Sequence, residues 1–143
     1  MAAAYSTQAA ATPASPFSEK LLPELGSYHG IELLPEMIAR AKELFPQISL
    51  QQGDFMHKKL PVCDYVLVSG TLNYGLDIFP AIRKLYGSCK TGLGFNLLRK
   101  VSAEGILKAH EPKEILSFAK TITHRVVLQD DYSHEDFSLF LYR

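Results

Sequence analysis

The sequence has no excess of charge of either sign. Its 143 residues carry fifteen Lys and Arg against fifteen Asp and Glu, so the formal net charge is zero. A protein that binds nucleic acid or an anionic membrane surface needs basic residues in local excess. No run of Lys or Arg here is longer than a pair. We therefore expect no nucleic-acid partner.

Long apolar runs and clustered cysteines are also missing. No stretch approaches the roughly 20 residues that span a bilayer, and the N-terminus lacks the basic and apolar regions of a secretory signal. Cys63 and Cys89 are far apart, with no second Cys or His beside either, so they fit neither a disulfide framework nor a zinc site. We predict a cytoplasmic protein with no membrane partner, in which both cysteines are buried.

The chain divides by composition into two parts. Residues 1–16 consist almost entirely of Ala, Ser, Thr and Pro without charge, and such a segment buries too little apolar surface to offset its chain entropy. We expect it to be disordered. Residues 17–143 have the composition of one globular domain, long enough to bury an apolar core without metal or disulfide bonds.

Helical and strand patterns alternate through the second part. Apolar residues recur at helical spacing in four segments: 17–25, 35–45, 78–86 and 111–122. Short apolar or alternating runs predict six strands: 28–32, 48–52, 65–68, 93–98, 125–129 and 137–142. The polar connector at 130–136 is short enough to make the last two strands antiparallel neighbours. The order predicts an α/β fold with a mostly parallel sheet, helices on both faces and a C-terminal antiparallel hairpin.

Three segments carry a resemblance to a known family. Residues 28–38 read YHGIELLPEMI, residues 52–55 read QGDF, and residues 64–73 read DYVLVSGTLN. In their order and spacing they resemble the class I S-adenosylmethionine-dependent methyltransferases, over roughly residues 17–143. The resemblance implies a Rossmann-like methyltransferase sheet.

The resemblance also implies a cofactor, S-adenosyl-L-methionine, and transfer of its methyl group to a small-molecule acceptor. Glu32 would accept hydrogen bonds from both ribose hydroxyls, and Leu33 would lie against the adenine. Asp54 and Phe55 would meet the adenine edge, while Ser69 would lie near the methionine. The sulfonium already activates the methyl group, so such a protein mainly positions donor and acceptor, and no catalytic base is predicted.

Simpler interpretations of the same residues stay open. Glu32 also fits a solvated loop carboxylate, and Asp54 an ordinary Asx-type turn. Asn73, Tyr74 and His110 could face a substrate, without a catalytic role assigned to any of them. Acidic residues and one histidine at 130–136 suggest a metal site, but they lack the spaced oxygens and central glycine of a calcium loop. We favour a charged hairpin loop and predict no metal.

The glycine-rich loop of the family is absent from the sequence. It should fall near residues 9–15, which read AAATPAS, and residues 1–8 lack the apolar residues of a central strand. The first strand of the sheet is therefore expected to be degenerate or absent. Residues 1–8 could pair as a poor substitute, the neighbouring strands could close up, or a partner, such as a second copy, could supply the edge. The second functional hypothesis is thus a catalytically inactive or truncated domain that acts through protein association.

Overall fold

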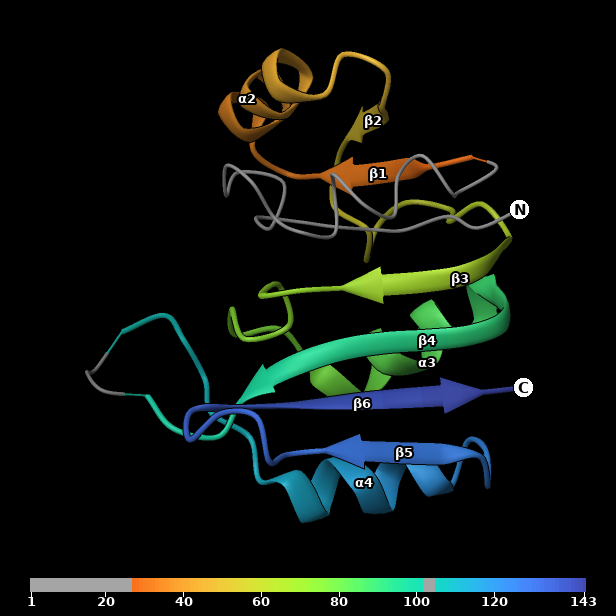
Figure 1. Ribbon diagram of the computed structural model, residues 1–143, viewed down its shortest axis with the longest axis vertical. Helices are drawn as coiled ribbons and strands as arrows, with labels where there is room; N and C mark the ends of the chain where they lie inside the picture. The colour runs from red at the N-terminus through yellow and green to blue at the C-terminus, as the bar shows by residue number, and fades with distance from the viewer. Residues whose placement is uncertain (1–26, 102–104) are drawn as a thin grey trace.

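The computed structural model describes residues 27–101 and 105–143, which form six strands and three helices (Figure 1). In chain order they are β1 (His29–Glu32), α2 (Pro35–Leu44), β2 (Ser49–Gln52), β3 (Cys63–Val68), α3 (Ile78–Ser88), β4 (Cys89–Leu98), α4 (Pro112–Lys120), β5 (Val126–Gln129) and β6 (Asp136–Tyr142). All six predicted strands are confirmed, as are the three predicted helices in this range. The predictions for residues 1–16, 17–25 and the loop near 9–15 lie outside the described residues.

The strands form two sheets. β1 and β2 make a parallel pair, and the other four follow the order β3-β4-β6-β5. In Figure 1 the arrows of β1, β3, β4 and β5 point the same way and only β6 is reversed. The mostly parallel α/β sheet with a C-terminal antiparallel hairpin is confirmed. Among the described residues β1 and β3 are not paired, so these neighbouring strands do not close up on each other.

β4 begins at Cys89, four residues before the strand predicted at 93–98, because α3 leads into it without a loop. The strand begins with CKTG, which has weak strand propensity, but the pairing of Cys89 and Gly92 with β3 outweighs that preference, and β6 pairs from Gly92 onward. Gly94 then allows close packing. A Cβ there would lie 2.9 Å from Leu67 Cδ2 and 3.1 Å from Phe140 Cδ1, both on neighbouring strands.

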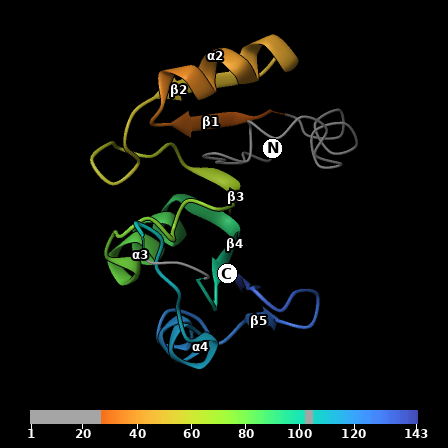
Figure 2. The same cartoon turned by 90° about the vertical axis from the view of Figure 1, so that its left-hand side faces the viewer.

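The apolar core lies between the four-stranded sheet and the helices α3 and α4. The rings of Phe79 of α3 and Phe118 of α4 are in contact, with centroids 4.4 Å apart and planes tilted by 50°, so both helices cover the same face (Figure 2). β6 alternates strictly, with Phe137, Leu139 and Leu141 fully buried. This alternation fixes the register of the hairpin, since a slip of one residue would expose all three.

Two smaller expectations concern membranes and cysteines. None of the helices in the described part of the chain is long and apolar enough to cross a bilayer. Cys63 and Cys89 are both buried as free thiols, as predicted.

Candidate functional site

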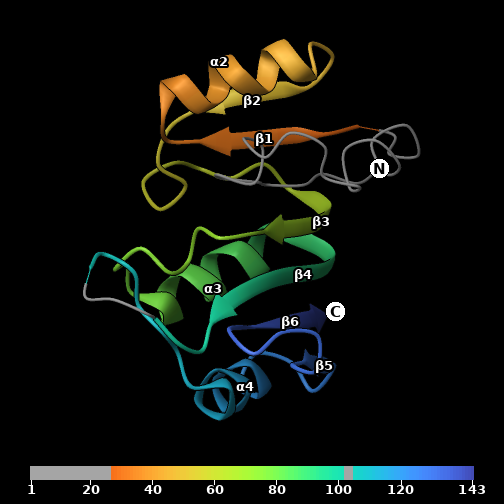
Figure 3. The ribbon, with the colours of Figure 1, turned by 60° about the vertical axis from the view of Figure 1, so that its left-hand side comes forward.

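Glu32 is the last residue of β1, at the edge of the sheet where the parallel strands end. Glu32 is only 2% exposed, so the interpretation of this residue as a solvated loop carboxylate is wrong. The Leu34 amide donates to Glu32 Oε1 at 3.0 Å, and the Gly53 amide donates to the Glu32 carbonyl at 2.9 Å. The second bond joins the ends of β1 and β2, so the loop after β2 lies beside the end of β1 (Figure 3).

Asp54 lies two residues beyond Gln52, which pairs with Glu32 in the register of β1 and β2. The two carboxyl groups therefore belong to the same edge of one sheet. Asp54 Oδ1 accepts from the Met56 amide at 2.8 Å, and Oδ2 lies 2.7 Å from His57 Nδ1. The Asx-type turn is thus present. It is compatible with ligand binding, because each carboxylate oxygen accepts more than one hydrogen bond.

Several groups control the charge of Asp54. Burial raises the pKa of its carboxyl, but the bonds from Met56 and His57 and the nearby charge of Lys84 outweigh burial and hold the pKa below its usual value. Asp54 is therefore ionised at neutral pH and serves only as an acceptor. An exocyclic amine is a matching donor.

Leu33 and Phe55 follow Glu32 and Asp54 but differ in exposure. Leu33 is 56% exposed and offers an open apolar surface beside Glu32, whereas Phe55 is only 8% exposed and belongs to the core. A role for Phe55 at a ligand is therefore limited to its backbone. Burial, and secondarily the charge of Glu32, raises the pKa of Tyr28 to about 12, so this phenol is neutral.

Ser69 is exposed just beyond β3, and Gly70 follows it in a left-handed conformation with φ of 73°. The Gly70 amide donates to Asn96 Oδ1 of β4 at 2.8 Å. A Cβ on Gly70 would have no atom within 4 Å, so the glycine is required by the backbone and not by crowding. The strands β1 and β3 end at the same edge in Figure 1; Glu32 is the last residue of β1, and Ser69 is the first residue after β3.

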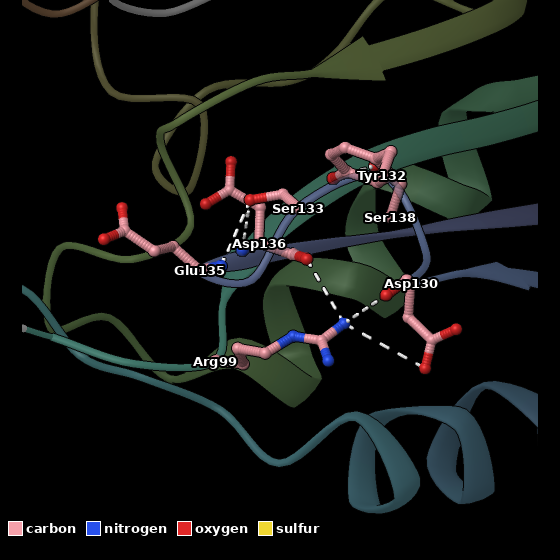
Figure 4. A network of polar contacts seen from close by, with 7 residues as sticks. All are labelled: Arg99, Asp130, Tyr132, Ser133, Glu135, Asp136 and Ser138. Atoms are coloured by element: carbon pink, nitrogen blue, oxygen red, sulfur yellow. Dashed lines mark hydrogen bonds and ion pairs between the residues drawn. The ribbon is translucent and has the colours of Figure 1, made fainter.

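The acidic connector between β5 and β6 is organised by a cation. Arg99 Nη2 donates to the carbonyls of Asp130 and Asp136 at 3.0 and 3.2 Å, and lies 4.0 Å from Asp130 Oδ2 (Figure 4). Ser133 Oγ accepts from the amides of Glu135 and Asp136. Within residues 27–101 and 105–143 no group of three His, Cys, Asp or Glu could hold a metal ion. The contacts in this part of the chain are those of a charged hairpin loop.

The three further residues singled out in the sequence have different surroundings. Asn73 is buried, and its Oδ1 accepts from the Leu98 amide at 3.0 Å, so it braces the loop after β3 against β4. Tyr74 is 38% exposed. His110 follows β4, its Nε2 is buried, and that atom forms no hydrogen bond with the described residues.

Lys84 and His57 lie beside the candidate site, but no sequence motif pointed to them. Lys84 Nζ reaches from α3 to the carbonyl of Met56 at 2.6 Å. His57 is mostly exposed and pairs with Asp54 within one turn of chain. Only an acidic residue three positions before a histidine could have suggested the second contact, and the first has no local signature.

Comparison with known structures shows what kind of fold this is. The sequence matches no family model and no curated protein. A S-adenosylmethionine-dependent methyltransferase from Clostridium acetobutylicum superposes with a TM-score of 0.72 at 12% identity, covering 98% of this chain and 83% of its own. The chain has a methyltransferase fold. At this identity the likeness concerns the fold alone.

Two further structures agree with this likeness. CalS10, an amino pentose methyltransferase from Micromonospora echinaspora solved with bound cofactor, gives a TM-score of 0.72 at 12% identity, covering 98% of this chain and 83% of that one. The plantazolicin methyltransferase BpumL gives a TM-score of 0.75 at 12% sequence identity, and the match covers 99% of this chain and 76% of BpumL.

Proposed function

We propose that the protein binds S-adenosyl-L-methionine and transfers its methyl group to a small-molecule acceptor. The observation that carries the proposal is the pair of carboxyl groups, Glu32 and Asp54, at the adjacent ends of the parallel strands β1 and β2. Ligands of open α/β sheets bind at the carboxyl ends of the strands. One nucleoside at this edge could touch both groups.

The acceptor groups present fit the nucleoside half of the cofactor. Glu32 Oε1 accepts from the Leu34 amide, and because a carboxylate oxygen can accept more than one hydrogen bond, the same carboxyl group would accept from the ribose hydroxyls. The exposed side chain of Leu33 would lie against the adenine, and ionised Asp54 would accept from its amino group. Ser69 would lie near the methionine. When bound, the cofactor supplies an activated methyl group, and these residues only hold and orient it.

Calorimetric titration with S-adenosylhomocysteine tests this proposal. We expect Glu32→Ala to weaken binding roughly tenfold or more, because hydrogen bonds to a charged group each contribute about 1.5–3 kcal/mol. Glu36→Ala is the matched control, since Glu36 is an exposed glutamate in the first turn of α2. Glu32→Gln should retain an acceptor for the Leu34 amide, which separates loss of binding from loss of folding.

The same titration addresses the alternative of an inactive or truncated domain that acts through association. The sequence at 9–15 favours it, because no glycine stands there. Ligand at 100 times its dissociation constant stabilises a binding protein by about 2.7 kcal/mol. If millimolar ligand produces no heat of binding and no thermal shift, the methyltransferase proposal is rejected. Equal affinity of wild type and Glu32→Ala would remove Glu32 from the ribose role.

The acceptor and the assembly need separate measurements. Two of the compared methyltransferases are described with small-molecule products or ligands, and we propose an acceptor of that class here. Transfer of labelled methyl groups to a panel of small molecules would identify it. A homo-oligomer, a cytoplasmic location and the absence of a nucleic-acid partner stay predictions, of which the first is checked by sedimentation.

A further inference from the structure

One lysine connects the two parts of the molecule that the cofactor has to bridge. Lys84 Nζ donates to the Met56 carbonyl at 2.6 Å. This hydrogen bond joins the segment 27–58, which holds β1, α2 and β2, to the helix α3 that packs on the four-stranded sheet. The bond ends in the turn that Asp54 begins.

The Asp54 turn is otherwise held by local bonds. The amides of His57 and Lys58 both donate to the Asp54 carbonyl at 3.1 Å, and Lys58 Nζ donates to the Gln52 carbonyl at 2.6 Å. These contacts shape the turn, but they do not fix its place relative to the four-stranded sheet. The apolar side chain of Phe55 packs in the core without a directional bond.

Lys84, by contrast, projects from a firmly packed helix. Ile82 and Leu85 of α3 are at most 1% exposed and lie in the main core cluster. The Ser69–Gly70 loop precedes this helix in the chain, and its Gly70 amide is bonded to Asn96 of β4. The helix and the loop thus belong to one rigid frame, from which Lys84 reaches the Asp54 turn.

We propose that Lys84 is a positioning residue that sets the Asp54 turn relative to the Ser69–Gly70 loop, so that one cofactor can contact both. This inference rests on the proposed function, in which Asp54 meets the adenine and Ser69 lies near the methionine. A misplaced turn penalises a ligand that spans both places more than a ligand that occupies one.

Calorimetry with two ligands tests the proposal. S-adenosylhomocysteine spans both places, whereas adenosine reaches only Glu32 and Asp54. We expect Lys84→Met to weaken the binding of S-adenosylhomocysteine roughly tenfold and the binding of adenosine by less than about threefold. Lys84→Arg should retain most of the wild-type affinity because it keeps a donor. Lys120→Met, at the exposed end of α4, is the matched control and should leave both affinities unchanged.

Two results would overturn the proposal. Equal losses for both ligands would mean that Lys84 acts only through the charge of Asp54, and unchanged affinities would mean that it does not act on binding. If the wild type itself fails to bind S-adenosylhomocysteine, the proposed function fails instead. Hydrogen exchange then decides the role of Lys84: faster exchange of the His57 and Lys58 amides in Lys84→Met supports a positioning contact, and unchanged exchange rejects it.

Discussion

The four-stranded sheet and the β1–β2 pair differ in how they are stabilised. β4 and β6 pair over seven residues, and the inward residues of β6 are fully buried. β1 and β2 have four residues each, and three of the four residues of β2 are exposed. Yet the carboxyl groups that could recognise a nucleoside stand on the shorter pair. Most of the apolar core and the candidate site are therefore carried by different parts of the molecule.

Single buried side chains attach the β1–β2 region to the core of the four-stranded sheet. Ile31 is 1% exposed and precedes Glu32, and Phe55 is 8% exposed and follows Asp54. Glu32 and Asp54 are thus each adjacent to a residue of the core. This arrangement holds the polar groups in place although little apolar surface of their own strands is buried.

The largest effect should come from a pair of leucine truncations, one in each region. Leu139→Ala removes a fully buried side chain of β6 and should lower the free energy of unfolding by about 2–5 kcal/mol. Leu33→Ala removes the same atoms from a residue that is 56% exposed and should change the free energy of unfolding by less than about 0.5 kcal/mol. Urea denaturation of the two variants measures both changes.

Ligand binding should respond in the reverse order. If Leu33 lies against the adenine, Leu33→Ala weakens S-adenosylhomocysteine, while Leu139→Ala binds normally under conditions where it is folded. Comparable losses of stability in the two variants would contradict this difference, because the β1–β2 pair would then be as much a part of the core as the four-stranded sheet.

The sequence was sufficient for most of the fold because the packing follows local patterns. The alternation of β6 and the helical spacing in α3 and α4 are both visible as periods in the chain. The start of β4 is not predicted because its first residues have weak strand propensity, and it is the pairing of Cys89 and Gly92 with β3 that holds them in the sheet. Such pairing depends on distant residues and leaves no local pattern.

For the site, the sequence indicated the edge but not its surroundings. Glu32 and Asp54 were found through resemblance, and the register of β1 and β2 brings them to one edge. The burial of Glu32 was not foreseen. Lys84 could not be found, because its partner is a backbone carbonyl 28 residues away, and a backbone atom carries no sequence signal.

A smaller effect should come from two glycines, one at the candidate site and one in the frame. Gly70 has φ of 73°, which a Cβ penalises, so Gly70→Ala should lower stability by about 1 kcal/mol. Gly87 lies within α3 with open space around it, so Gly87→Ala should raise stability by about 0.5–1 kcal/mol. Thermal denaturation compares the two. A stabilising Gly70→Ala would show that the loop after β3 is free to change conformation.

The smallest effect concerns the pH dependence of each region. Burial lowers the pKa of His110, Lys108 adds to the lowering, and Glu114 opposes it. At pH values between this lowered pKa and the pKa of about 6.5 of an unfolded histidine, the unfolded chain binds more protons than the folded one. The free energy of unfolding therefore falls as the pH drops through that interval. The lowered pKa of Asp54 also favours the folded state, but its contribution is lost only as the pH falls below about 4.

The two groups can therefore be separated by pH. Between about pH 7.5 and pH 5.5, His110→Gln should reduce the shift of the urea midpoint, because glutamine does not titrate. His124→Gln is the matched control, since His124 is exposed just before β5. It should leave the shift as in the wild type. If both variants show the wild-type shift, the acid sensitivity in this range does not come from the partly buried His110 imidazole. The expected difference in pH response between His110 and Asp54 would then be absent.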